Sequence, residues 1–184
     1  CGEMILEKLL LPKEMYPTFE AVTPEHLSEL GITHIFCDID NTLATYDDPT
    51  PPENVVNWCR RMNEGGITVS FVSNNDQARV ELFNRDFGYT AYAKAKKPLI
   101  GTLKKAMAEA GGVPEKSALL GDQLLTDAAA GNRAGLYVII VPPIKDKTNL
   151  FFRFKRLCER PFIRKYARAH GYREWMKFWK IKDQ

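Results

Sequence analysis

Residues 35–43 constrain this chain most, because a short apolar run passes there directly into a polar loop. The stretch reads Ile-Phe-Cys-Asp-Ile-Asp-Asn-Thr-Leu, and a proline-rich segment follows it. A short apolar run bounded by turn residues is typical of a buried β-strand. Asp38 and Asp40, spaced one residue apart, would then lie at the carboxyl end of that strand. We therefore expect two neighbouring carboxylates with separate tasks at one strand end.

Further short strands rich in β-branched residues alternate with helices along the chain. Glycine residues close most of these helices, as expected at helix ends. Strands that are apolar on both faces and separated by helices indicate a parallel sheet covered on each side, which is an α/β fold. The sequence predicts five parallel strands, over residues 32–37, 67–72, 89–93, 117–120 and 136–141.

Composition divides the chain into three predicted parts. Residues 1–31 read as a helical segment, with a helix over 4–16 interrupted by Pro12. Residues 32–145 form the α/β core. Residues 146–184 form a basic, aromatic-rich helical tail, in which Pro161 and Gly171 are predicted breaks.

Charge is unevenly distributed over the 184 residues. Residues 151–184 hold eleven Lys and Arg against three acids, which leaves −5 on residues 1–150 within a net charge of +3. A basic appendage on an acidic domain usually indicates an anionic partner. No apolar run approaches the ~18 residues of a membrane span, and residues 1–4 do not resemble a signal peptide. The four cysteines show no metal-binding spacing, so we expect a cytoplasmic protein with reduced thiols.

Four polar signals follow four of the predicted strands. Asp38 and Asp40 follow the first, Ser73 the second, Lys97 the third, and residues 122–127 the fourth. Each alone has an ordinary structural explanation as a turn, a helix cap or a solvated side chain. Together they meet at the carboxyl edge of a parallel sheet, where open α/β sheets bind ligands.

Phosphoryl transfer is the chemistry that these side chains would support. Acids from two strand ends, such as Asp38 and Asp122, repel one another unless a hard cation lies between them, and Mg²⁺ prefers carboxylates, water and phosphate oxygens. Ser73 and nearby backbone N–H groups would hold phosphate oxygens, and a lysine would stabilise charge on the transferring group. A carboxylate nucleophile would divide hydrolysis into two displacements, with its neighbour exchanging protons.

The motifs Asp-Ile-Asp-Asn-Thr, Ser-Asn-Asn, Lys-Pro and Gly-Asp-x-x-x-x-Asp resemble the four motifs of the haloacid dehalogenase (HAD) superfamily. The resemblance covers about residues 32–141. It implies the HAD-like Rossmannoid fold. Within the superfamily the chain looks most like the YqeG-type phosphatases of subclass IIIA, which are similar to the mitochondrial phosphatidylglycerophosphate phosphatases.

The resemblance implies a role for each acid. Asp38 is implied as the nucleophile and a Mg²⁺ ligand. Asp40 is implied as the general acid/base, with its backbone carbonyl on the metal. Asp122 is implied as the acidic metal ligand of the fourth motif. Asp127 is implied to bind the metal through water or to support the other ligands.

The remaining implied roles concern phosphate. Ser73 would bind it, with Asn74 assisting, and Lys97 would stabilise the transferring group. Lys94 and Lys96 are the alternatives to Lys97.

Neither interval that carries a cap domain in many HAD enzymes has room for one here. Residues 42–67 hold only a loop and a helix, and residues 74–97 only a helix and a short strand. We therefore expect an open site, which suits a phosphate displayed on a membrane lipid or a macromolecule. Phosphatidylglycerophosphate is the substrate that we favour, and a small phosphometabolite is the alternative.

The basic tail has three interpretations. An amphipathic, cationic and aromatic-rich helix is typical of peripheral contact with anionic phospholipid, and its aromatic side chains could instead pack on the core. Binding of nucleic acid, as in an RNA- or ribosome-associated phosphatase, is the third. We favour the membrane, and we predict no partner protein. A non-enzymatic alternative for the whole chain is a receiver-like module that stores phosphate on Asp38.

Overall fold

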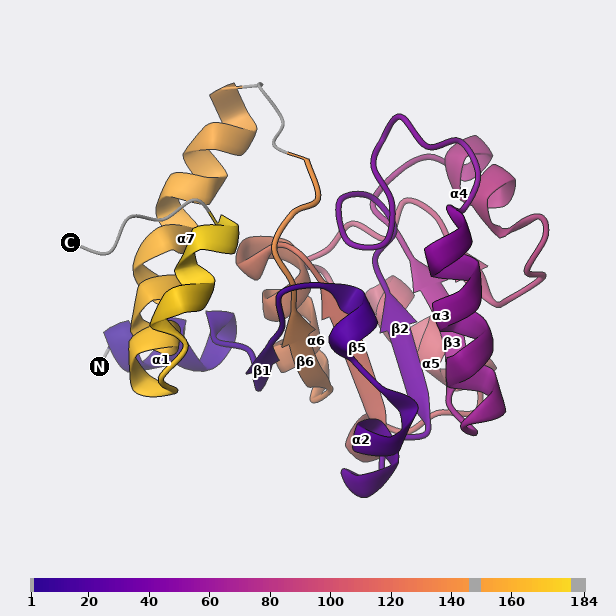
Figure 1. Ribbon diagram of the computed structural model, residues 1–184, viewed down its shortest axis with the longest axis horizontal. Coiled ribbons are helices and arrows are strands. Elements are labelled where there is room, and N and C mark those ends of the chain that lie inside the picture. Colours follow the sequence, from indigo (N-terminus) through magenta and orange to yellow (C-terminus); the bar gives the residue numbers. More distant parts are fainter. Residues whose placement is uncertain (1, 146–149, 180–184) are drawn as a thin grey trace.

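A parallel sheet of six strands, in the order β1-β6-β5-β2-β3-β4, forms the centre of the molecule (Figure 1). The structure is a computed structural model that describes residues 2–145 and 150–179. The strands are β1 (Glu14–Met15), β2 (His34–Cys37), β3 (Thr68–Val72), β4 (Ala91–Tyr92), β5 (Ser117–Gly121) and β6 (Tyr137–Ile140).

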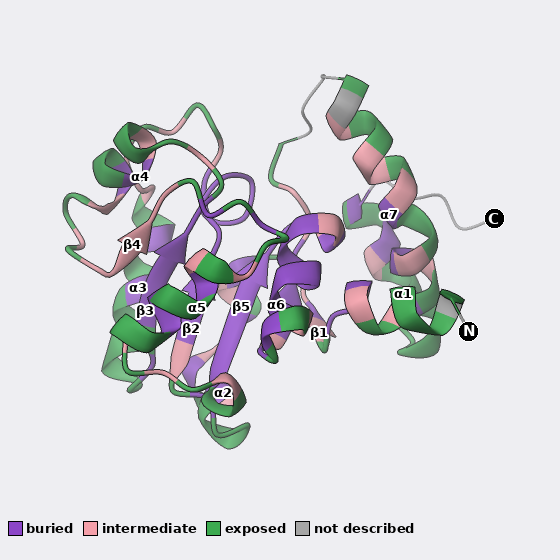
Figure 2. Cartoon of the chain, turned by 180° about the vertical axis from the view of Figure 1, so that it is seen from behind, coloured by how far each residue is buried: buried purple, intermediate pink, exposed green. Residues whose placement is uncertain are grey.

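Helices cover both faces of this sheet, as the double-sided apolar strands predict. Ile35 and Cys37 of β2 pack with residues of α2, α3 and α4, whereas Phe36 packs on the opposite face with α5 and α6. Figure 2 shows the strands buried between these layers. The helices are α1 (Gly2–Leu10), α2 (Pro24–Glu29), α3 (Glu53–Glu64), α4 (Gln77–Asn84), α5 (Gly101–Glu109), α6 (Ala129–Ala134) and α7 (Leu150–Ala169).

The sheet has one strand more than the five predicted. Residues 4–16 were expected to be an interrupted helix, but α1 ends at Leu10 and β1 pairs with β6 at the edge of the sheet. Pro12 has no N–H with which to extend the helix, and the Tyr16 N–H donates to the Ile140 carbonyl at 3.1 Å. A two-residue strand is too short to show the alternation by which strands are recognised.

The helix α7 runs unbroken for 20 residues through Pro161, where the sequence predicts a break. Pro161 is exposed, while Glu159 and Ile163 on either side of it are buried. Pro161 has no N–H to donate to the carbonyl four residues before it, and that carbonyl lies on the same exposed side of the helix. Packing of the buried residues on either side of Pro161 outweighs the low helix propensity of proline. Gly171 does end the helical run, with a φ of 74°, and residues 173–179 form a separate 3₁₀ helix.

Helix α7 and the 3₁₀ helix after it pack on the β1–β6 edge of the sheet together with α1 (Figure 1). Ile163, Tyr166 and Met176 are buried there in one apolar cluster with Leu10 and Val138. Several aromatic residues of the basic tail thus pack on the core, as one of the three interpretations expected. Residues 146–149 and 180–184 of the predicted tail lie outside the described residues.

The two intervals in which a cap domain was not expected contain none. Residues 42–67 hold a loop and α3, and residues 74–97 hold α4 and β4. The boundaries at residues 31 and 145 stay predictions, although β1 shows that the N-terminal segment is helical only in part. Among the residues that the structure describes, no helix is both long enough and apolar enough to cross a membrane.

We predict that Trp58→Phe lowers the free energy of unfolding by about 1–3 kcal/mol, because it leaves a buried carbonyl without its donor. The Trp58 indole N–H donates to the Val22 carbonyl at 2.9 Å, and both residues are fully buried in the core. Urea unfolding followed by circular dichroism measures the change.

Trp179→Phe is the matched control, because the buried indole N–H of Trp179 has no hydrogen-bond partner among the described residues. Its loss should be smaller than that at Trp58. Equal losses would contradict a contribution from the Trp58 hydrogen bond.

Candidate active site

The carboxyl ends of β2, β3 and β5 lie level in the sheet. Cys37, the last residue of β2, is in register with Phe71 of β3 and Leu120 of β5. The N–H of Asp38 continues the ladder by donating to the Leu120 carbonyl at 2.9 Å. The residues that follow these strands therefore emerge at one edge, as the alternation of strands and helices predicts.

Lys97 lies at the centre of this edge. Its Nζ is 2.8 Å from Oδ1 of Asp38 and 2.7 Å from Oδ1 of Asp127, and its side chain is almost fully buried. Burial alone would lower the pKa of Lys97, but Asp127 and Asp38 outweigh it and hold this pKa above its usual value. The structure brings Lys97 to the site and leaves the alternatives Lys94 and Lys96 exposed.

Three buried carboxylates gather around the same point. Oxygen atoms of Asp38, Asp122 and Asp127 all lie within 4.8 Å of one another. Burial raises the pKa of Asp38 to about 8; Lys97 opposes this rise, and the other two acids add to it. Burial likewise raises the pKa of Asp122, against the lowering effect of Arg156. A divalent cation fits here, since it would offset charge that the nearby cations do not balance.

Asp127 is held against the end of β5 by the turn between them. Its Oδ2 accepts the N–H groups of Asp122 and Gln123 at 3.2 and 3.1 Å. A Cβ on Gly121 would lie 2.3 Å from Cγ of Asp127, so only glycine allows this approach. One turn of π-helix, Leu124–Ala128, returns the chain to that point. The spacing of the fourth motif thus places both of its acids in the cluster.

Asp40 points away from the three clustered carboxylates, toward helix α4. Arg79 Nε donates to its Oδ1 at 3.1 Å, and the Asn75 amide donates to its Oδ2 at 2.9 Å. Arg79 also donates to the carbonyls of Thr45 and Pro49, so it ties the loop after β2 to Asp40. The sequence does not predict a role for Arg79, because nothing local relates it to an acid 39 residues earlier.

Ser73 and Asn74 both lie at the edge, with different contacts. The Ser73 hydroxyl accepts the N–H of Asn75 at 3.1 Å and lines the same cavity as Asp38. The Asn74 side chain accepts the Lys97 N–H at 2.7 Å and donates to the Lys97 carbonyl at 3.1 Å. Asn74 therefore positions the lysine backbone, and its contact with phosphate stays a prediction.

Arg156 and Glu159 of α7 contact the fourth motif, which the sequence does not predict. Arg156 donates to the Asp122 carbonyl at 2.8 Å, forms an ion pair with the Asp122 carboxylate, and lies 3.0 Å from Glu159. The fully buried Glu159 accepts the N–H of Leu125 at 3.0 Å. Glu159 is the one acid between residues 147 and 173. A single acid in such a basic stretch could have indicated that the Glu159 side chain faces the protein rather than water.

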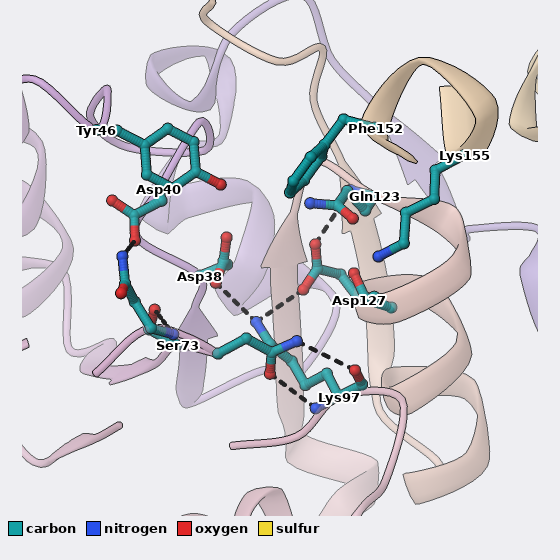
Figure 3. A pocket seen from close by; sticks show the side chains of 12 residues that line it. Asp38, Asp40, Tyr46, Ser73, Lys97, Gln123, Asp127, Phe152 and Lys155 are labelled. Atoms are coloured by element: carbon teal, nitrogen blue, oxygen red, sulfur yellow. Dashed lines mark hydrogen bonds and ion pairs between the residues drawn. The ribbon is translucent and has the colours of Figure 1, made fainter. Parts of the chain in front are cut away.

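A cavity of about 240 Å³ opens above these groups. Figure 3 shows Asp38, Lys97 and Asp127 at its base, with Tyr46 and Asp40 on one side and side chains of α7 on the other. Burial, together with the charges of Asp122, Asp38 and Asp40, raises the pKa of Tyr46. As expected, residues 42–67 and 74–97 insert no cap domain over the site. Side chains of α7 nevertheless form one wall of the cavity, which the sequence did not predict.

The chain is similar in sequence to known proteins. Residues 94–143 match the model of the HAD-hydrolase-like family. Over 171 residues the chain is 36% identical to a protein of Bacillus subtilis (strain 168) named "Probable phosphatase YqeG", and the match covers 93% of this chain and 99% of that protein.

Solved structures support the fold. One is a Vibrio cholerae protein described as a "putative 3-deoxy-D-manno-octulosonate 8-phosphate phosphatase". It superposes with a TM-score of 0.52 at 17% identity, and the match covers 65% of this chain and 72% of the other. An uncharacterised protein of Listeria monocytogenes serotype 4b gives a TM-score of 0.50 at 18% identity, covering 64% and 85%.

We predict that Arg156→Met lowers the free energy of unfolding by about 3–5 kcal/mol, because it leaves the buried Glu159 carboxylate without its cation. Urea unfolding of the metal-free protein measures this change. The neighbouring Arg160 is exposed, so Arg160→Met should change stability by no more than about 0.5 kcal/mol. A loss at Arg156 as small as that at Arg160 would show that the buried pair is not stabilising.

Proposed function

Because the chain belongs to the YqeG-type phosphatases of the HAD superfamily, we propose that it hydrolyses phosphomonoesters through an aspartyl-phosphate on Asp38. The observation that carries the proposal is that Asp38 contacts Lys97 and lies in one cluster with the carboxylates of Asp122 and Asp127. A nucleophile beside a cation and a cluster of carboxylates that could hold a metal ion suits attack on an anionic phosphate. The storage of phosphate by a receiver-like module does not agree with membership of a phosphatase family.

We propose Mg²⁺ as the cation held by Asp38, Asp122 and Asp127, since a hard cation with several carboxylate and phosphate oxygens is the ordinary Mg²⁺ environment. When bound, it would offset the negative charge of the phosphate and of the attacking carboxylate. Lys97 supplies a fixed positive charge in the same place. Asn74 binds the Lys97 backbone and two carboxylates contact its ammonium, so the position of the positive charge is fixed.

In the first displacement, a carboxylate oxygen of Asp38 attacks phosphorus and the bond from phosphorus to the alcohol oxygen breaks. Asp40 gives a proton to the departing alcohol. In the second, the Asp40 carboxylate takes a proton from water, whose oxygen attacks phosphorus and frees Asp38 and inorganic phosphate. Arg79 and Asn75 hold the two oxygens of Asp40 and fix the direction in which it exchanges protons.

We predict that Asp38→Asn lowers the rate of phosphate release from p-nitrophenyl phosphate at least about 10³-fold, because an amide does not replace the nucleophile. EDTA should abolish the activity of the unaltered enzyme, and added Mg²⁺ should restore it. Asp47 is an exposed acid on the neighbouring loop, and Asp47→Asn serves as a control that retains activity. Turnover by the Asp38→Asn enzyme at the control rate would remove Asp38 from the role of nucleophile.

We propose phosphatidylglycerophosphate, presented on a membrane surface, as the substrate. The support is the absence of an inserted cap domain from residues 42–67 and 74–97 and the character of α7. The beginning of α7 exposes Leu150, Phe154 and Leu157 beside several basic residues. Apolar side chains among cations are typical of a helix that lies on anionic lipid. The same helix borders the cavity, so a membrane that bound it would present lipid head groups near Asp38.

We predict that the protein co-sediments with phosphatidylglycerol vesicles and not with phosphatidylcholine vesicles. Leu157→Asp should reduce this binding at least about fivefold, because it removes an apolar contact and adds a repulsive charge. Leu82 is an exposed leucine on α4, and Leu82→Asp is the matched control. Equal binding to both lipids, or equal effects of the two substitutions, would contradict the proposal. Salt-dependent RNA binding instead would favour the nucleic-acid alternative.

A further inference from the structure

Phe152 and Lys155 of α7 line the cavity together with Asp38 and Asp127. Figure 3 shows both side chains pointing from the helix toward the groups at the base. We propose that Lys155 binds a second anionic group of the substrate, on the alcohol portion that is released. This inference rests on the proposed phosphatase function and narrows it to phosphomonoesters that carry another negative charge.

Lys155 lies at a different place in the cavity from the other cations of the site. Lys97 is in contact with two carboxylates at the base, and its side chain is 1% exposed. Arg79 is bound to Asp40, and Arg156 to Asp122 and Glu159. Each of these three cations contacts carboxylates at the base of the site or beside it. Lys155 is half-buried on the wall above them, where the rest of a substrate would extend.

The shape of the cavity leaves room for such a group. Its volume of about 240 Å³ exceeds what one phosphate would fill. Phe152 gives the same wall an apolar surface, with the Lys155 ammonium 5.6 Å from its ring centre. An alcohol portion with a short carbon chain and an anionic group would find both kinds of contact there. One ammonium in a partly water-excluded cleft attracts an anion more strongly than it would in bulk water.

The helix that carries Lys155 is anchored at the next residue. Arg156 and Glu159 join α7 to Asp122 and to the Leu125 N–H. Farther along, Ile163 and Tyr166 are buried against the core. This anchoring sets the register of α7, so Lys155 is held at the cavity before substrate arrives. A preorganised contact loses less entropy on binding than one made by a mobile tail.

Three water-soluble phosphomonoesters test the proposal without any membrane. Glycerol 3-phosphate has no second anionic group, 3-phosphoglycerate adds a carboxylate, and the deacylated head group glycerophosphoglycerol phosphate adds a phosphodiester. The measured quantity is the ratio of kcat/KM for each doubly anionic substrate to that for glycerol 3-phosphate. Comparing the two ratios shows whether the site prefers a phosphodiester or a carboxylate, or accepts either group.

We expect Lys155→Met to lower at least one of these ratios about 10- to 100-fold, the effect of losing one hydrogen bond to a charged group. Lys155→Arg should restore most of the ratio, since it keeps the charge. Lys104 is exposed on α5, and Lys104→Met is the matched control that leaves both ratios unchanged.

An unchanged ratio in Lys155→Met, or an equal loss on all three substrates, would overturn the assignment of Lys155 while leaving the phosphatase function intact. A wild-type enzyme that turns over none of the three, with or without Mg²⁺, would overturn the proposed function and this inference with it.

Discussion

The site depends on a single constraint, the collection of several buried carboxylates at one end of a parallel sheet. Such acids repel one another, and burial strengthens that repulsion because water no longer screens it. Lys97 relieves part of it by contacting Asp38 and Asp127 at 2.8 and 2.7 Å, and Arg156 relieves another part at Asp122. The remaining excess is what makes the position suitable for a divalent cation. A divalent cation at this position would therefore be held by negative charge that the fold itself leaves uncompensated.

Much of the sheet was predictable, because the residues that build it repeat along the chain in a regular way. Strands such as β2 and β5 are apolar on both faces and end in polar residues, and a level register brings those ends together. Asp38, Ser73, Lys97 and Asp122 could be placed at one edge for that reason. Choosing Lys97 over Lys94 and Lys96 came from the motif rather than from periodicity, and the structure agrees by burying only that lysine.

What escaped prediction depends on contacts between segments that are distant in sequence. Arg79 meets Asp40, and Arg156 meets Asp122, without any local pattern that marks them as partners. The edge strand β1 and the continuation of α7 through Pro161 have the same origin, since in both cases tertiary packing decides a conformation that local propensity disfavours or leaves open. The part of the cavity wall that α7 forms was not predicted, because the composition of residues 146–184 indicates a basic appendage.

The ion pair between Arg156 and Asp122 affects the order in which the site forms during protein synthesis. The sheet and the motifs that supply its acids precede residue 145, whereas the residues that complete the site lie in α7. Chains fold from the N-terminus as they leave the ribosome. A nascent chain would therefore display its sheet and its cluster of acids before Arg156 had emerged. The ion pair of Arg156 with Asp122 can form only after α7 has been synthesised, later than the sheet that carries the acids.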